Sequence, residues 1–161
     1  MKKIFKFALV AFAAAAVAVA CKKPAQDQNQ DEQKQEEQKQ DEQKPAAFDP
    51  STYEVNEAMA GADTWGLIGP AQTGGWDADT DLTKVADATI ETWKGTIELA
   101  ADKFKFRGND TWGDYDLGGG TVVIGEPIVL SKGGGDMAIT EADTYDVTLY
   151  PTIMVCILEK K

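Results

Sequence analysis

The sequence predicts an all-β fold, an antiparallel β-sandwich of immunoglobulin-like size, for the C-terminal part of the chain. Between residues 63 and 158, short apolar or alternating runs recur at intervals of about 8–12 residues. Clusters of Gly, Asp and Asn separate these runs, and such clusters are typical of turns. No stretch keeps a helical spacing of apolar residues over three turns. Short strands joined by tight turns are typical of two packed antiparallel sheets.

The expected strands are placed by their apolar or alternating residues. They cover 64–68, 90–99, 103–107, 121–124, 128–130, 137–139, 145–150 and 153–158. A short helix is expected around residues 81–86. Trp65 and Trp93 fall inside strands, so both are expected in the core. Cys156 lies in a continuous apolar run, which predicts a buried thiol, with an intermolecular disulfide as the alternative.

The N-terminal segment, residues 1–20, has the layout of a signal peptide. Lys2, Lys3 and Lys6 form a positive start, and an alanine-rich apolar run follows. This run is too short to cross a membrane comfortably. It ends on small residues directly before Cys21, so it resembles a lipobox, which implies cleavage before Cys21 and lipid on its thiol. The alternative is an ordinary signal peptide that ends beside a cysteine by chance.

Residues 21–62 are expected to form the lipid anchor and a low-complexity linker, and residues 63–161 the folded domain. From Lys22 to Pro45 the chain contains no large apolar residue and repeats a short unit of acids, glutamine and lysine. Such a composition cannot bury a core, so we expect a disordered or partly helical stalk. The stalk is interpreted as a spacer, with a charge–glutamine interaction motif as the alternative.

Composition excludes several classes of function. The chain holds 27 acidic and 16 basic residues, a net charge of −11, and no histidine. Binders of nucleic acid present basic patches, so no nucleic-acid partner is expected. Without histidine, Ser/His/Asp and Cys/His catalysis and histidine-based zinc sites are excluded. The acids of 77–81 alternate as in a calcium loop, but Leu82 and Ala88 stand where glycine and glutamate are required. We therefore expect no metal and no cofactor.

The segment 103–107, Lys-Phe-Lys-Phe-Arg, is the most informative strand. Side chains alternate between the two faces of a strand. Phe104 and Phe106 are therefore expected in the core, with Lys105 and Arg107 on the solvent face beside Lys103. Such a row of cations suits hydrogen bonding to a ligand. The alternative is protection of a sheet edge or pairing with the many carboxylates.

Trp76 and Trp112 are expected at loops or strand ends, where a large aromatic side chain is harder to bury. An indole ring stacks on the apolar face of a pyranose, and neighbouring cations and carboxylates bind the sugar hydroxyls. The two tryptophans are therefore candidates for a sugar-binding surface. The alternative is that they close the ends of the sandwich.

Five segments in order resemble one starch-binding domain of the SusE/SusF outer-membrane lipoproteins of Bacteroidetes polysaccharide-utilisation systems. The resemblance covers the whole predicted domain, and its segments are 65–71 (WGLIGPA), 74–77 (GGWD), 104–107 (FKFR) with Trp112, 134–137 (GGDM) and 144–149 (TYDVTL). Members of this family bind oligosaccharides beside a porin-like transporter and do no catalysis. This chain has one such domain where the family carries several in tandem.

The resemblance implies which residues contact glycan. They are Trp76, Lys105, Arg107, Trp112, Lys132 and Asp136. It implies a non-catalytic lipoprotein that binds starch-like oligosaccharide, anchored by outer-membrane lipid at Cys21 and facing the cell exterior. The alternative is a structural or assembly lipoprotein that docks on another outer-membrane protein and has lost the sugar site. No local motif marks a catalytic carboxylate pair, so no enzymatic activity is expected.

Overall fold

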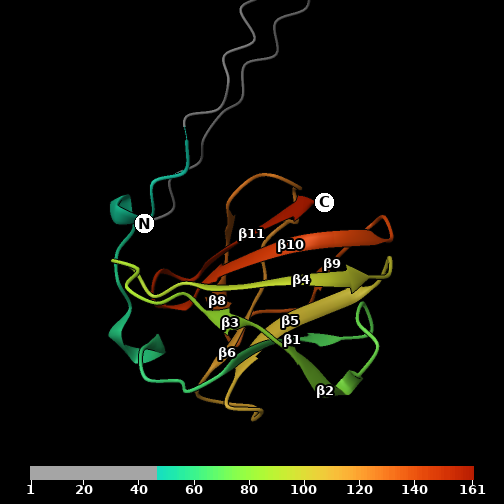
Figure 1. Ribbon diagram of the computed structural model, residues 1–161. Helices are drawn as coiled ribbons and strands as arrows, with labels where there is room; N and C mark the ends of the chain where they lie inside the picture. Colours follow the sequence, from blue (N-terminus) through green and yellow to red (C-terminus); the bar gives the residue numbers. More distant parts are fainter. Residues whose placement is uncertain (1–46) are drawn as a thin grey trace, which may run out of the picture. The chain divides into compact units, whose positions relative to one another are not determined.

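The computed structural model describes residues 47–161 of the chain. Two antiparallel sheets pack face to face, which confirms the predicted all-β sandwich (Figure 1). Within the described residues the helical segments are three short 3-10 turns, η1 (Pro50–Thr52), η2 (Glu57–Met59) and η3 (Pro151–Ile153). The predicted stalk and the anchor at Cys21 lie outside the described residues.

The first sheet has the strand order β2-β1-β5-β6-β8, and β9 also pairs with β5. Its strands are β1 (Trp65–Gly69), β2 (Gly75–Asp81), β5 (Lys103–Gly108), β6 (Asp116–Gly118), β8 (Ser131–Lys132) and β9 (Met137–Ala138). β1 and β5 are its centre, because each pairs on both sides.

The second sheet has the strand order β3-β4-β10-β11-β7. Its strands are β3 (Thr83–Lys84), β4 (Trp93–Leu99), β7 (Ile128–Val129), β10 (Asp143–Tyr150) and β11 (Val155–Lys160). The long strand β10 pairs with β4 on one side and β11 on the other, and these three strands form a continuous surface.

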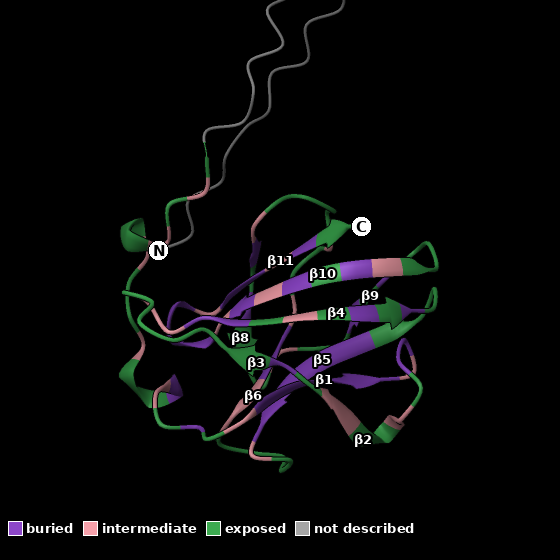
Figure 2. Cartoon of the chain, in the orientation of Figure 1, coloured by how far each residue is buried: buried purple, intermediate pink, exposed green. Residues whose placement is uncertain are grey.

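The core lies between the two sheets and contains the alternate, inward side chains of both. Figure 2 shows buried segments on the strands of both sheets. Phe104 and Phe106 are fully buried in it and meet edge to face, as the alternation of β5 predicts. Trp65 and Trp93 are buried as expected. Cys156 is buried too, and burial raises the pKa of its thiol far above the ordinary range, so the side chain is an inert part of the core.

The folded unit extends further toward the N-terminus than the predicted boundary at residue 63. Met59 is fully buried and belongs to the core cluster, as does Ala62. The backbone N–H of Asn56 donates to the carbonyl of Thr152 at 2.6 Å. The end of the segment 47–62 is therefore packed with the sandwich rather than forming the end of a linker, because Met59 and Ala62 insert into the core.

Several elements differ from the predicted pattern. The segment Thr121–Ile124 forms no strand, although its residues favour one, and Val123 is half exposed. The expected helix around residues 81–86 is absent, because β2 continues to Asp81 and β3 follows directly. The acidic segment that resembled a calcium loop is the body of β2.

Candidate functional site

An ion pair spans the outer face of the first sheet. Arg107 on β5 points away from the core and contacts the carboxylate of Asp79 on β2 through two nitrogens. Its Nη2 lies 2.5 Å from Asp79 Oδ1, and its Nε donates to Oδ2 at 3.0 Å. The Asp79 side chain is 1% exposed and the Arg107 side chain 8%. This bidentate geometry fixes the plane of the guanidinium group.

Gly66 makes room for this ion pair. It lies on β1, between the strands that carry the two partners, and its cross-strand neighbour on β5 is Arg107. A Cβ at this position would lie 2.6 Å from the Cβ of Asp79. The absence of a side chain here lets Asp79 and Arg107 meet above the central strand.

A second ion pair lies beside the first. The Nζ of Lys105 is 2.7 Å from Oδ1 of Asp116 on β6, and both side chains are mostly buried. Gly118 makes room for the lysine, since a Cβ there would lie 2.8 Å from its Cε. Two cations and two carboxylates thus share one face of the sheet, and their charges balance.

The prediction that Lys105 and Arg107 face solvent is wrong in one respect. The alternation places them on the outer face, as expected, but the residues are only 8% and 7% exposed. Their carboxylate partners and the ring of Trp112 cover them. The two cations therefore lie beneath the surface and are paired with carboxylates, and they are not open hydrogen-bond donors on that surface.

Trp112 lies over both cations. The guanidinium carbon of Arg107 is 5.0 Å from the centroid of the indole ring, and Lys105 Nζ is 5.6 Å from it. These distances are within the range of cation–π attraction. Both cations come from the sheet, so they approach the sheet side of the ring. Trp112 remains 49% exposed, so about half of its surface is open to solvent.

Trp76 lies next to Trp112. The two ring centroids are 6.1 Å apart and the ring planes are inclined by 49°. Trp76 is 38% exposed. We call this pair of exposed indoles the tryptophan platform. The structure thus brings Trp76, Lys105, Arg107 and Trp112 together on one face, with the indoles outside and the cations below.

Local hydrogen bonds hold both tryptophans in place. Ahead of Trp76, the amide of Gln72 donates to the carbonyls of Gly75 and Ala78 and accepts from the N–H of Gly74. Ahead of Trp112, Asn109 adopts a positive φ of 56°, which asparagine tolerates better than most residues. Its side-chain oxygen accepts from the backbone N–H groups of Asp63 and Thr64. The loop before Trp76 is therefore pinned to β2, and the loop before Trp112 to the residues that precede β1.

The other two predicted glycan contacts lie away from the platform. Lys132 on β8 is the cross-strand partner of Leu117, a core residue, so it lies on the opposite side of the sheet from Lys105. Its ammonium group is 3.7 Å from Asp114. Asp136 lies just before β9 and forms an exposed ion pair with Lys103 at 3.6 Å. Among residues 47–161, the cation–π contacts to Trp112 come from Lys105 and Arg107 and not from Lys132.

Sequence reasoning missed the residues that support the platform. Asp79 and Asp116 were not singled out as partners of the cations, and Gly66 was not recognised as the gap between them. Cross-strand register brings these residues together, and register is not visible in a single sequence. The signal that was available is the placement of glycine inside a strand, which marks a close approach.

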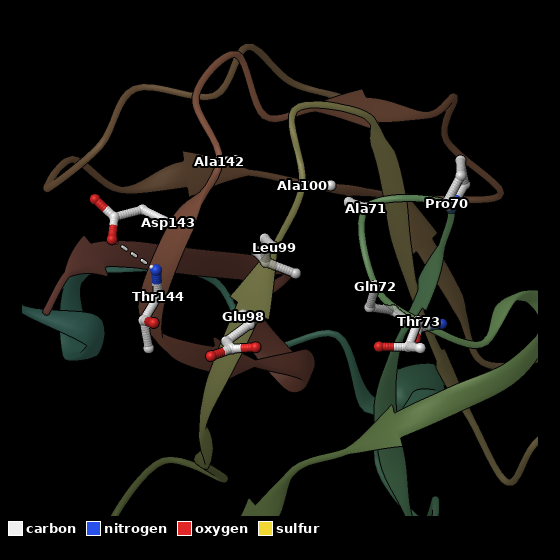
Figure 3. A pocket seen from close by; sticks show the side chains of 10 residues that line it. All are labelled: Pro70, Ala71, Gln72, Thr73, Glu98, Leu99, Ala100, Ala142, Asp143 and Thr144. Atoms are coloured by element: carbon white, nitrogen blue, oxygen red, sulfur yellow. Dashed lines mark hydrogen bonds between the residues drawn. The ribbon is translucent and has the colours of Figure 1, made fainter.

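One cavity, with a volume of about 490 Å³, is lined by neither Trp76 nor Trp112 (Figure 3). The loop after β1, the end of β4 and the start of β10 form its walls. Gln72 lines it, but the hydrogen bonds of this side chain are already made. Asp143 is paired with Lys160.

No family model matches the chain, and no curated protein matches it. Among residues 47–161, no three Cys, Asp or Glu side chains form a group suited to hold a metal ion. Within the same residues, no helix is both long and apolar enough to cross a bilayer.

Proposed function

We propose that this chain is a non-catalytic cell-surface lipoprotein that binds an oligosaccharide of the starch or maltooligosaccharide type. The observation that carries the proposal is the tryptophan platform, two neighbouring exposed indoles inclined by 49°. Apolar side chains that are exposed next to one another, rather than singly, are typical of interaction and ligand-binding surfaces. Adjacent pyranose rings of one chain stack on two such surfaces at once.

The ion pairs below the platform support this function. Arg107 and Lys105 approach the inner side of the Trp112 ring, and Asp79 and Asp116 hold them there. The ring is therefore oriented before a ligand arrives, which reduces the entropy lost on binding. A shallow platform of this kind is suited to weak binding, with dissociation constants of about 1 μM to 1 mM.

The lipobox-like sequence at Cys21 and the polar stalk support a place at a membrane surface. Lipid on Cys21 would anchor the chain, and the stalk would hold the folded unit away from the headgroups. The resemblance to SusE/SusF domains supports the outer membrane and its exterior side. A porin-like transporter is the partner that this resemblance suggests.

Titration of the full-length protein with maltoheptaose, in a detergent without a sugar headgroup, tests the proposal. We expect a saturable heat of binding in isothermal titration calorimetry at micromolar to millimolar glycan, a readout that does not depend on the tryptophans themselves. The double variant Trp76→Ala with Trp112→Ala should lose this response. Val129→Ala, at an exposed apolar position outside the platform, is the control and should bind normally. Binding that survives in the double variant would refute the platform as the site.

A second candidate function is docking on another outer-membrane protein. It is favoured by three exposed apolar side chains in and just before β7, which are Val123, Ile124 and Val129. Val129 is 61% exposed on a strand at the edge of its sheet. Crosslinking in cells should then recover a protein partner, and Val129→Asp should abolish the crosslink. An unchanged crosslink in this variant would count against docking at β7.

A further inference from the structure

The outer face of the second sheet carries a polar groove that the tryptophan platform does not use. Cross-strand register places Lys94, Thr148 and Ile157 in one row across β4, β10 and β11. The next row contains Thr96 and Glu159 with Asp146 between them. Both rows point away from the core, because Val147 on β10 and Leu158 on β11, which lie between them along the strands, are buried.

Two adjoining hollows lie on this face. One has a volume of about 430 Å³ and the other about 300 Å³, and both are lined by Lys94, Thr148 and Glu159. The shared residues make the two hollows parts of one groove. We call it the second-sheet groove. Each part falls near or within the range of about 300–1,000 Å³ that small-molecule sites occupy.

One end of the groove has an aromatic wall. Phe48 and Tyr150 both line it, and their ring centroids are 5.2 Å apart with the planes inclined by 49°. Ile157 adds an apolar surface beside them. Phe48 belongs to the segment before η1, so this wall exists only because that segment packs with the sandwich. Aromatic and aliphatic surfaces of this kind contact the C–H faces of sugar rings.

Thr96 and Asp146 in the groove are hydrogen-bonded to each other, but other polar groups of its lining are available to a ligand. Among residues 47–161, no salt bridge involves Lys94, Glu126 or Glu159, although all three line the groove. Lys94 is a donor, the carboxylates are acceptors, and the hydroxyl of Thr148 is both. A lining with both signs of charge and an aromatic end matches a neutral, polyhydroxylated chain better than an anion or a cation.

We infer that the second-sheet groove is a second oligosaccharide site, separate from the tryptophan platform. The two sites lie on opposite outer faces of the sandwich, with the core between them. One folded unit then binds two glycan chains, or two segments of one long chain. The gain in avidity that tandem domains provide would be present within a single domain.

The inference is tested by nuclear magnetic resonance on the full-length protein in a detergent without a sugar headgroup. The probes are maltoheptaose, cellohexaose and mannohexaose. The backbone amides of Thr96 and Thr148 report on the groove, and the indole N–H signals of Trp76 and Trp112 report on the platform. We expect both sets to shift with at least one glycan and to give different dissociation constants.

The groove variant is Lys94→Ala combined with Glu159→Gln, and the matched control is Lys161→Ala, an exposed lysine outside the groove lining. In the groove variant, the dissociation constant obtained from the Thr148 amide shifts should rise by about tenfold or more. The indole shifts of Trp76 and Trp112 should be unchanged. The control should change neither.

The possible outcomes separate the two sites. Indole shifts without groove shifts for every glycan would overturn the second site and leave the proposed platform in place. Groove shifts alone would support the second site and overturn the platform. Shifts at Thr148 that persist in the groove variant would show that the groove is not where the glycan binds. If neither the groove amides nor the platform indoles shift with any glycan, both proposals are overturned.

Discussion

The guanidinium carbon of Arg107 lies 5.0 Å from the centre of the Trp112 indole while its nitrogens hold Asp79. One side chain thus connects a buried carboxylate to an exposed aromatic ring. The carboxylate sets the position of the guanidinium group, and the guanidinium group supports the ring from below. The buried ion pair of Asp79 and Arg107 therefore sets the orientation of the exposed Trp112 ring.

Arg107→Lys should weaken glycan binding without removing either indole. A lysine cannot make the bidentate contact to Asp79 and stack on Trp112 at the same time. Loss of one cation–π contact predicts about two- to fivefold weaker affinity. Fluorescence titration with maltoheptaose measures the change, and Lys161→Ala is the control. An affinity equal to that of the parent protein would contradict a supporting role for Arg107.

Asp79→Ala should destabilise the fold. The variant leaves the guanidinium group of Arg107 mostly buried and without its carboxylate, which costs about 3–5 kcal/mol when a buried pair is broken. Urea unfolding followed by circular dichroism measures the loss. Asp81→Ala is the matched control, because Asp81 lies two residues along the same strand and is exposed. It should change the free energy of unfolding by less than about 0.5 kcal/mol.

Gly66→Ala should disturb the same ion pair from the opposite side. The added methyl group would lie 2.6 Å from the Cβ of Asp79 and 3.1 Å from its Oδ2. Crowding of this kind costs about 1–3 kcal/mol. Gly135→Ala has no atom within 4 Å of its new methyl group and should be tolerated. Equal melting temperatures for the two variants would show that Asp79 does not need the space above Gly66.

Met59→Ala should lower the free energy of unfolding by about 2–5 kcal/mol, because it leaves a cavity in the core. Val55→Ala changes a half-exposed side chain four positions earlier and should have an effect within about 0.5 kcal/mol. Chemical denaturation compares the two. A neutral Met59→Ala would mean that the segment before β1 contributes little to the fold.

The interactions of Asp143 predict that the folded domain loses stability in acid. The backbone N–H of Thr144 and the ammonium group of Lys160 hold the pKa of Asp143 below its ordinary value of 3.8. Its stabilising contribution is therefore complete above that value and is lost as the pH falls through the folded-state pKa. Asp143→Asn should be less stable than the parent at pH 7 and should converge with it in strong acid. Parallel curves of stability against pH would contradict this assignment.

The pKa of Asp79 is shifted in the opposite direction, so its effect on stability has the opposite dependence on pH. Burial raises its pKa above 3.8 despite the hydrogen bond from Arg107. The folded state therefore keeps the proton of this carboxyl to a higher pH than the unfolded chain does, and the resulting contribution to stability is complete below 3.8 and is lost as the pH rises through the folded-state pKa. The two aspartates thus oppose each other in the acid range, and Asp143→Asn isolates one of them.

The sequence predicted the strands whose pattern was strong. Phe104 and Phe106 alternate with cations, so both the strand and its buried face could be assigned, and both rings are in the core. Thr121–Ile124 was assigned as a strand for its β-branched residues, yet it forms none. Propensity alone was insufficient there, because a strand also needs a neighbour to pair with.

The sequence by itself determined that residues 63–158 form a β-sandwich, since alternation and turn residues depend only on neighbours along the chain. It also placed Lys105 and Arg107 on one face of their strand. Only the tertiary structure decided what covers that face, because Asp79, Asp116 and Trp112 reach it from other strands and a loop. Pairing between strands fixes these contacts, and one sequence does not state which strands will be neighbours.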